Sequence, residues 1–320
     1  MAQRQGKITL WEIEVFVATA EEASVSAAAR RLDTSPATVS QQLTNLERDV
    51  GAPLLNRSER PLTLTPAGEI FLRRANAILN EADQARAELT MAGQGALTRV
   101  RLGMIEDFDA DVTPRLLQSM AEALGSSSFL LETGASHRLF DQLEARALDT
   151  IVAADMGLGA EGHEVHPLLE EPFVIAAPKG AFGGKPSLRD LIALPHIQYT
   201  TRHHMGRAIA AHLARQNLHF PQRFELDSYH ALLAMVAAGA GWTILTPLGW
   251  NHAPRFQEAV EMVPLPGRAL TRTISLTARR GILGDLPGDV AARLRPLITE
   301  LVITPVTARA PWLDGALKRL

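Results

Sequence analysis

A tight turn, Asp33-Thr34-Ser35, constrains the fold more than any other feature of this 320-residue chain. Ser35 is a favourable N-cap, and Pro36 follows it at the first helical position, where a missing N–H is no loss. Behind the turn, apolar residues recur at helical spacing until Gly51 and Pro53: Val39, Leu43, Leu46 and Val50. The pattern predicts a helix that starts directly after a turn.

Two further helices are predicted before this turn. Thr9 with Glu12 can form a capping box before apolar residues at helical spacing, and Ser24 can cap a second, short helix that ends near Leu32. Three short helices around a tight turn are typical of a helix-turn-helix. Alternating residues between positions 53 and 65 then predict a short β-ribbon, which would be a wing.

A long helix is predicted to follow, from Pro66 to about Met91. Its apolar residues alternate between spacings of four and three, as in the seam of a coiled coil: Phe71, Ala75, Ile78, Ala82, Ala85 and Leu89. A seam without a partner seam nearby in the sequence favours self-association over burial in a core. We therefore expect dimerisation through this helix.

The exposed face predicted for the helix behind the turn is small and polar, as a surface that enters a DNA groove must be. Gln41 or Asn45 can make bidentate contacts to adenine. The expected DNA-binding residues are Ser24, Ser26, Arg30, Arg31, Ser35, Pro36, Ala37, Thr38, Ser40, Gln41, Thr44, Asn45, Arg57 and Arg60. The alternative is a helical bundle with an ordinary solvated face, since residues 1–65 carry seven basic against eight acidic side chains. DNA binding is favoured if the arginines share one face with that helix.

Beyond Gly95 the sequence alternates between strands and helices, which predicts an α/β architecture with parallel sheets. Strands are expected at 100–105, 129–132, 150–154, 173–177, 197–199, 243–245 and 274–277. Helices are expected at 116–124, 137–148, 206–216, 228–238 and 290–302.

Residues 9–68 resemble the DNA-binding domain of LysR-type transcriptional regulators. Several separate pieces stand in that family's order and spacing: Phe16, Ala27-Ala28-Ala29, Leu32, Ser35 to Ser40, Leu46-Glu47, Gly51, Pro53-Leu54, Arg57 and Leu64-Thr65-Pro66-Ala67-Gly68. Leu55 stands where the family usually has Phe, which is a change in packing. The rest of the chain resembles the family's effector domain more loosely, through Gly134-Ala135-Ser136 and through the run from Met235 to Gly241 before Pro247.

This resemblance implies a mainly α winged helix-turn-helix joined to an α/β, periplasmic-binding-protein-like effector domain of two subdomains with a ligand cleft between them. On this sequence we place the winged helix-turn-helix at 1–65, the linker dimerisation helix at 66–93 and the effector domain at 94–304. Subdomain 1 then takes 97–168 and 269–304, subdomain 2 takes 169–268, and 305–320 form a C-terminal tail. The expected partners are double-stranded DNA, a small-molecule effector, RNA polymerase and further copies of the chain, as a homodimer or homotetramer.

The cleft is located by the rule that α/β sheets bind ligands outside the C-terminal ends of their strands. This rule gives the effector-binding residues Glu106, Asp107, Phe108, Ser136, His137, Asp155, Thr200, Thr201, Arg202, His203, Ser228, Tyr229 and Thr246. One rim is acidic, at Glu106 and Asp107, and the other basic, at Arg202 and His203, which favours a zwitterionic or cationic polar effector. The alternative for the hydroxyl-bearing residues, Ser136 above all, is that they only cap the helices that follow.

Several function classes find no support in the sequence. The chain has no cysteine, which excludes disulfides, thiolate metal sites and thiol redox sensing. It has no dinucleotide, nucleophile-elbow, zinc-protease or Walker motif, so neither catalysis nor a cofactor is expected. Four histidines near strand ends lack the spacing of metal ligands and are expected to form hydrogen bonds instead: His137, His203, His204 and His230.

The location and the competing functions follow from weaker signals. The sequence shows neither a signal segment nor an apolar stretch long enough to span a bilayer, which predicts a cytoplasmic protein. An α/β enzyme with a fused regulatory helix-turn-helix remains an alternative, because catalytic sites can lack sequence motifs. An architectural DNA-binding protein without an effector is a third interpretation.

Overall fold

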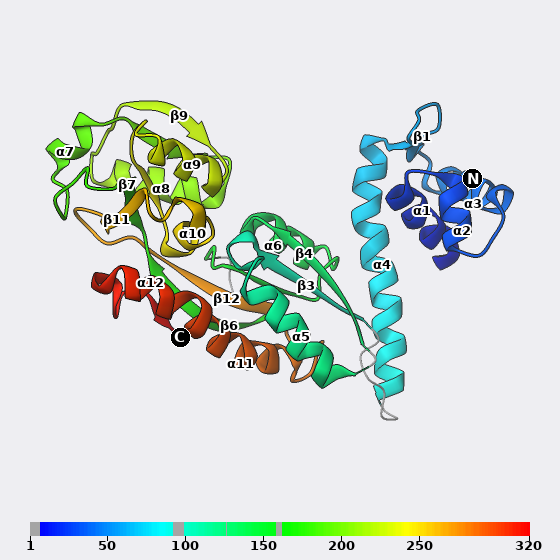
Figure 1. The fold of residues 1–320 in the computed structure, drawn as a ribbon. Helices are drawn as coiled ribbons and strands as arrows, with labels where there is room; N and C mark the ends of the chain where they lie inside the picture. The colour runs from blue at the N-terminus through cyan, green and yellow to red at the C-terminus, as the bar shows by residue number, and fades with distance from the viewer. Residues whose placement is uncertain (1–6, 92–98, 126, 158–161) are drawn as a thin grey trace. The chain divides into compact units, whose positions relative to one another are not determined.

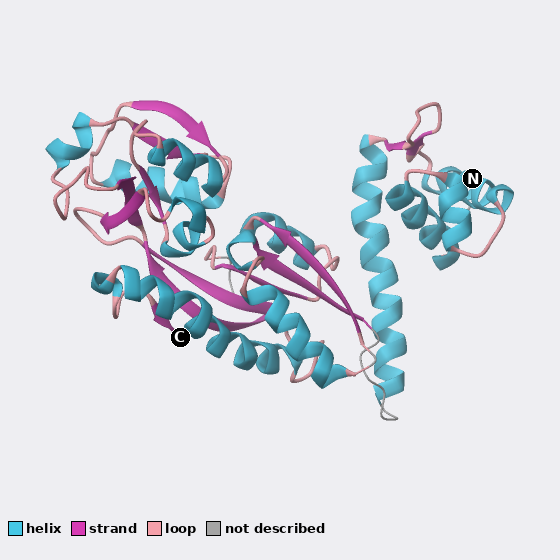
Figure 2. Ribbon diagram, in the orientation of Figure 1, coloured by secondary structure: helices cyan, strands magenta, loops and turns pink. Residues whose placement is uncertain are grey.

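The computed structural model describes residues 7–91, 99–125, 127–157 and 162–320 (Figure 1). It divides into an N-terminal unit, Met1–Thr98 with the short segment Glu144–Ala147, and a C-terminal unit, Arg99–Leu143 with Leu148–Leu320. Figure 2 shows that the first is mainly helical and that the second combines helices with sheets. This arrangement confirms the predicted fold class.

The N-terminal unit contains three short helices, a two-stranded hairpin and one long helix. In chain order these are α1 (Leu10–Glu22), α2 (Val25–Arg31), α3 (Pro36–Val50), β1 (Leu55–Asn56), β2 (Thr63–Leu64) and α4 (Pro66–Met91). The two strands pair antiparallel, so the predicted wing is a short hairpin behind α3.

The predicted helix boundaries are confirmed by the caps that form. Thr9 and Glu12 make the reciprocal capping box of α1. Ser24 and Ser35 each accept a backbone N–H at the start of α2 and α3. Gly51 ends α3 with φ at 80°, in the left-handed region that glycine adopts without strain.

The first turns of α4 complete the core of the N-terminal unit. Phe71 on α4 contacts Phe16 on α1 edge to face, with ring centroids 5.4 Å apart, and Ala75 is fully buried in the same core. Gly68 lets α4 approach the wing closely, because a Cβ there would lie 2.0 Å from the carbonyl oxygen of Leu54. The beginning of the apolar stripe on α4 is therefore used within the protomer.

The remainder of that stripe is open or lies outside the described side chains. Ile78 is 43% exposed, Ala82 is half-buried and Ala85 is exposed. The side chain of Leu89 falls outside the described part of the chain. Dimerisation through α4 stays a prediction, and its available surface starts at Ile78.

The described part of the C-terminal unit contains three sheets, and the largest, with six strands, belongs to subdomain 1. Its strand order is β13-β6-β12-β5-β3-β4. The strands are β3 (Arg99–Ile105), β4 (Ser128–Gly134), β5 (Thr150–Ala154), β6 (His163–Pro172), β12 (Thr271–Arg279) and β13 (Lys318–Arg319). The helical elements are η1 (Glu106–Phe108), α5 (Val112–Leu124), α6 (Ser136–Glu144), α11 (Leu286–Ile298), η3 (Thr299–Ile303), α12 (Thr304–Arg309) and η4 (Pro311–Leu313). Helix α11 packs against α5 and against the strands β6 and β12.

Subdomain 2 is formed by the chain between β6 and β12. Its strands are β7 (Val174–Pro178), β8 (His196–Tyr199), β9 (Gln222–Leu226), β10 (Thr243–Leu245) and β11 (Val260–Pro264). Strands β10 and β11 flank β7, and β8 pairs with β9. The helices are α7 (Leu188–Ala193), α8 (His204–Arg215), α9 (Tyr229–Ala237), α10 (Pro247–Asn251) and η2 (Pro254–Phe256).

The prediction of parallel sheets is correct only in part. β3 pairs parallel with β4 and with β5, and β8 pairs parallel with β9. β12 is antiparallel to β5 and to β6, and β7 is antiparallel to both of its neighbours. The long strands β6 and β12 carry the chain between the subdomains in opposite directions, and β6 escaped prediction because its sequence is rich in proline and charged residues, which strands disfavour.

The structure also incorporates residues 305–320, which the sequence suggested to be a tail. Val306, Leu313 and Leu317 are buried, and β13 pairs with β6 at the edge of the large sheet. The C-terminal segment is therefore part of subdomain 1.

Candidate functional sites

Helix α3 presents a polar face without large side chains. Val39, Leu43 and Leu46 are buried in the core, whereas Gln41 and Thr44 are exposed. The remaining expected residues of this helix, Pro36, Ala37, Thr38, Ser40 and Asn45, are exposed or half-buried. The surface can approach base edges because nothing bulky projects from it.

Two of these side chains are paired on the exposed face. The amide of Gln41 donates to Oδ1 of Asn45 at 3.0 Å, so the two amides form one hydrogen-bonding group. At the start of the helix, the hydroxyls of Ser35 and Thr38 are 2.8 Å apart. Ser24 serves mainly as the cap of α2, and Ser26 is exposed beside it.

Glu47 ties the wing to α3. Its Oε1 accepts the backbone N–H groups of Leu54 and Leu55 at 2.8 and 3.2 Å. Its Oε2 accepts from Nη2 of Arg57 at 2.7 Å, and the same Nη2 lies 3.3 Å from the hydroxyl of Thr44. The wing arginine is thereby held beside the exposed face of α3 by a carboxylate, a contact that was not predicted.

The other expected arginines differ in their availability. Arg31 pairs with Glu21 at 2.6 Å and with Glu22 at 3.4 Å, and these hydrogen bonds raise its pKa. Arg60 donates to two backbone carbonyls within the wing. Arg30 is exposed and has no ion pair among the residues that the structure describes. Arg31 and Arg57 are thus already paired with carboxylates, in keeping with the excess of acidic over basic side chains in residues 1–65.

A cavity of ≈ 360 Å³ lies between the two subdomains of the C-terminal unit. Strand ends of subdomain 1, the loop after β8, and helices α8 and α9 line it, together with the start of the crossover strand β12. Seven of the expected effector-binding residues line this cavity: Glu106, Asp107, Ser136, His137, Asp155, His203 and Tyr229. The strand-end rule therefore located the cavity and most of its polar lining.

Three expected residues from the loop after β8 do not line the cavity. Thr200 is buried and donates its hydroxyl hydrogen to Glu225 at 2.6 Å. The backbone N–H of Thr201 donates to the same carboxylate at 3.1 Å, and the Thr201 side chain is exposed. The side chain of Arg202 is 81% exposed. Glu225 on β9 therefore holds Thr200 and the backbone of Thr201, while the guanidinium of Arg202 lies 4.0 Å from Asp227.

Three further expected residues serve the fold. Phe108 is 1% exposed and is part of the buried apolar core. Thr246 is fully buried, where it caps α10 and accepts a hydrogen bond from Arg272. Ser228 precedes α9 and does not line the cavity.

Ser136 lines the cavity, and the hydrogen bond that its hydroxyl makes is to β5 and not to the helix that follows it. It stands at the start of α6 and lines the cavity, while its hydroxyl oxygen accepts the backbone N–H of Ala154 at 3.1 Å. The hydroxyl therefore fixes α6 against β5, and its hydrogen is still available to an acceptor.

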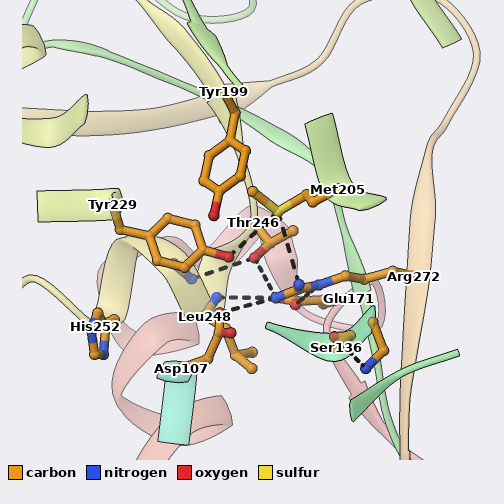
Figure 3. Close-up of polar contacts among 12 residues, drawn as sticks. Asp107, Ser136, Glu171, Tyr199, Met205, Tyr229, Thr246, Leu248, His252 and Arg272 are labelled. Carbon is orange, nitrogen blue, oxygen red and sulfur yellow. Dashed lines mark hydrogen bonds and ion pairs between the residues drawn. The ribbon is translucent and has the colours of Figure 1, made fainter. Parts of the chain in front are cut away.

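Sequence reasoning missed the buried ion-pair network at the floor of the cavity (Figure 3). Arg272 donates from Nε to Glu171 at 2.6 Å, and from Nη2 to Asp107 and Thr246, both at 3.0 Å. The second oxygen of Glu171 accepts the backbone N–H of Leu248 at 3.0 Å. One guanidinium thus joins the first turn after β3, the crossover strands and the N-terminus of α10 in subdomain 2.

Burial and charge set the protonation states in this region. Burial opposes the charge of Arg272, but the negative charges of Glu171 and Asp107 outweigh it and raise the pKa of Arg272 well above its ordinary value. Burial raises the pKa of Tyr229 and of Tyr199, so both phenols are neutral. Burial lowers the pKa values of His137 and His204, which favours their neutral forms.

Aromatic rings and a thioether form the remaining wall. The Tyr199 and Tyr229 rings are 5.6 Å apart, and the Tyr199 hydroxyl lies 3.3 Å from Nδ1 of His203. The Tyr229 hydroxyl donates to the sulfur of Met205 at 3.4 Å. The cavity therefore combines carboxylates, one arginine and an aromatic wall.

The described residues contain neither a metal-binding cluster nor a helix that could span a membrane. No three histidine or acidic side chains gather there in a way that would hold a metal ion. Of the helices in residues 7–91, 99–125, 127–157 and 162–320, none is both long and apolar enough to cross a membrane.

Comparison with known proteins gives family matches for both units. Residues 10–69 match the family model described as bacterial regulatory helix-turn-helix protein, lysR family, and residues 93–285 match the LysR substrate binding domain. The HTH-type transcriptional regulator DgdR of Burkholderia cepacia is 30% identical over 252 residues, which cover 77% of this chain and 82% of that protein. A "Probable hydrogen peroxide-inducible genes activator" of Mycobacterium xenopi is 34% identical over 182 residues, 56% of this chain and 95% of that protein.

A solved structure shares the fold over nearly the whole chain. The crystal structure of full-length CbnR complexed with its target DNA has a TM-score of 0.61 and 21% sequence identity. The similarity covers 92% of this chain and 99% of that one.

Proposed function

Because this chain belongs to the LysR family of bacterial transcriptional regulators, we propose that it reads specific DNA with α3 and changes its activity when a small polar molecule enters the cavity. The observation that carries the proposal is the position of the cavity, which is bounded by both subdomains and by β12 between them. A molecule that binds two subdomains at once can favour one of their arrangements over another.

DNA reading is assigned to the exposed face of α3, with Gln41 and Asn45 as the base-contacting amides. The solved CbnR structure was obtained with its target DNA, which supports this role for a chain of the same fold. Two copies of α3, one from each protomer, enter successive major grooves about one helical turn apart. Arg30, Arg57 and Arg60 contact phosphates and position the helix.

Self-association is assigned to α4, through the exposed part of its apolar stripe from Ile78 onward. A homodimer places two winged helices on one DNA site, and two dimers form a tetramer. Effector binding alters the arrangement of dimers on the DNA, and RNA polymerase is the partner that responds. We place the protein in the bacterial cytoplasm, because transcription takes place in that compartment.

The effector is proposed to be a polar molecule, zwitterionic or cationic, because carboxylates and hydroxyls line the cavity. Its proposed contacts are the seven expected residues that line the cavity, together with Arg272, Tyr199 and Met205, which were not predicted. The cavity volume of ≈ 360 Å³ is at the small end of the range for metabolite sites, which suits a compact ligand.

Peroxide sensing by thiol oxidation is not part of this proposal. One relative is named for hydrogen peroxide, but this chain has no cysteine, and a thiol is needed for that chemistry.

An enzymatic role is disfavoured because the relatives named above are regulators, and a turnover assay against metabolites would detect it.

Selection of DNA fragments from a random pool with the full chain tests the DNA-reading half. The proposal predicts an enriched sequence with two half-sites, and it predicts that Gln41→Ala loses preference at particular base pairs. Enrichment without any common sequence would contradict it.

A thermal-shift screen of metabolites tests the effector half of the proposal, because a ligand that binds only the folded state raises the melting temperature.

A further inference from the structure

We infer that the molecule held in the cavity is an organic cation with a primary ammonium group, and not a carboxylate. This inference rests on the proposed function, whose effector could also have been a zwitterion. It is carried by the charges, the aromatic rings and one carboxylate oxygen on the cavity wall.

The permanent charges that line the cavity are mainly negative. Glu106, Asp107 and Asp155 contribute three carboxylates, against one guanidinium, that of Arg272. Arg272 is already paired with Asp107 and, behind the wall, with Glu171. Because its charge is matched within the protein, little positive potential is left for an anionic ligand.

Of the basic rim that the sequence suggested, His203 lines the cavity but Arg202 does not. The side chain of Arg202 is 81% exposed and its guanidinium lies 4.0 Å from Asp227. Two of the histidines on the wall, His137 and His204, have lowered pKa values, because burial disfavours their charged forms. At neutral pH they are hydrogen-bonding groups and add no charge that would attract a carboxylate.

Asp107 offers an acceptor inside the cavity. Its side chain is only 6% exposed, and its Oδ1 accepts from Arg272 at 3.0 Å. Its other oxygen has no hydrogen-bond partner among the described residues. An ammonium group supplies N–H donors for this carboxylate oxygen, whereas a ligand carboxylate would bring two like charges together.

The aromatic wall suits the same group. Tyr199 and Tyr229 line the cavity with ring centroids 5.6 Å apart, and Phe173 adds a third ring. An ammonium group near ring faces is attracted by the ring quadrupole, and aromatic walls beside carboxylates are a common way to bind such cations. The apolar part of the ligand packs against the same rings and Met205.

The carboxylates at the rim of the cavity attract a cationic ligand before it makes direct contacts. Glu106 and Asp155 are exposed at the opening, and no ion pair of Glu106 is present among the described residues. Charges of one sign around a cleft raise the local concentration of oppositely charged ligands, and this effect weakens with salt. Amine binding should therefore fall as the ionic strength rises.

The test uses the full chain and matched sets of small probes that share a carbon skeleton: benzylamine, benzyl alcohol and benzoate, with butylamine, butanol and butyrate as a second set. Thermal shift finds the probes that bind, and calorimetry gives their dissociation constants at low and physiological salt. We expect the amines to bind, the alcohols to bind weakly and the carboxylates not to bind. In the double variant Glu106→Gln with Asp155→Asn, amine affinity should fall roughly tenfold.

A matched control is Glu122→Gln, which removes one negative charge from an exposed position on α5 outside the cavity. It should leave amine affinity unchanged. Carboxylates that bind, and bind more tightly in the double variant, would overturn the inference while leaving the proposed effector site intact. Amine affinity that is unchanged in the double variant would also overturn it, since the amine would then bind elsewhere. If no probe or metabolite of any charge binds, the effector half of the proposed function fails with it.

Discussion

Arg272 and Glu171 face each other across the strands β12 and β6, where Nε of the arginine donates to Oε1 of the glutamate at 2.6 Å. Glu171 is fully buried, and the Arg272 side chain is 11% exposed. Both strands run between the two subdomains, and the pair extends to Asp107 on one side and to Thr246 on the other. The pair therefore links the two walls of the cavity through its floor.

Replacing Arg272 by Met should destabilise the C-terminal unit by roughly 3–5 kcal/mol, because it leaves a buried carboxylate without its partner. Adding Glu171→Gln to that variant removes the unpaired charge and should recover part of the loss. Urea unfolding followed by circular dichroism measures both variants. A loss below about 1 kcal/mol in Arg272→Met would show that the pair is weak, as exposed pairs are.

The proposed contacts to phosphates and the proposed contacts to bases should respond differently to mutation. Arg30→Ala should weaken binding to every sequence alike and reduce the slope of log affinity against log salt by about one unit. Gln41→Ala should instead lose about 1–3 kcal/mol of discrimination at particular base pairs. Fluorescence anisotropy with the selected DNA and single-base variants of it separates the two effects. Sequence-independent loss in both variants would contradict the assignment of Gln41 to bases.

The proposed association of protomers through α4 can be tested by placing a charge on its apolar stripe. Ile78 is 43% exposed on the apolar stripe, and Ile78→Asp would put an unpaired charge into a protomer interface. Sedimentation should show a shift from dimer or tetramer towards monomer. The control is Arg73→Asp, which introduces the same side chain at an exposed position of α4 off the stripe. An unchanged oligomeric state in Ile78→Asp would remove this helix from the interface.

Acid should destabilise the protein through His196. This ring is 2% exposed, 4.7 Å from the ring of Trp242, and burial lowers its pKa from 6.5 to about 4. Between these pH values the unfolded chain binds a proton that the folded chain does not, so stability falls as the pH drops from 6.5 towards 4. The loss contributed by His196 reaches about 3 kcal/mol.

Unfolding in urea near pH 7 and near pH 5 measures this dependence. His196→Phe should flatten it relative to the unchanged chain, because the titrating group is gone. His219→Gln removes an exposed histidine and should preserve the slope. Parallel slopes in the unchanged chain and in His196→Phe would mean that other histidines carry the whole effect.

The sequence was most informative where local chemistry decides the structure. Ser35, Pro36 and Gly51 determine where α3 begins and ends through contacts within a few residues, so its boundaries and exposed face were predictable. Asp107 and Ser136 were found for a similar reason, because each follows a predicted strand and the ends of parallel strands meet at one edge.

The missed residues depend on contacts between distant segments. Arg272 meets Asp107 across 165 positions of sequence, on a crossover strand that no local pattern places beside the cavity. Thr200 was misassigned because its partner, Glu225, lies on β9, a strand that the sequence did not reveal. Tertiary contacts of this kind decide which way a loop side chain points, and the sequence alone does not contain that information in a readable form.

A ligand in the cavity is proposed to change how the protein binds DNA. The most direct measurement is a footprint of the full chain on its selected DNA, with and without a saturating amount of the tightest-binding amine from the probe screen. The account predicts that the amine changes the length or the spacing of the protected region, and that DNA changes the amine's affinity in return. Identical footprints in the two conditions, with the amine shown by calorimetry to be bound, would contradict it.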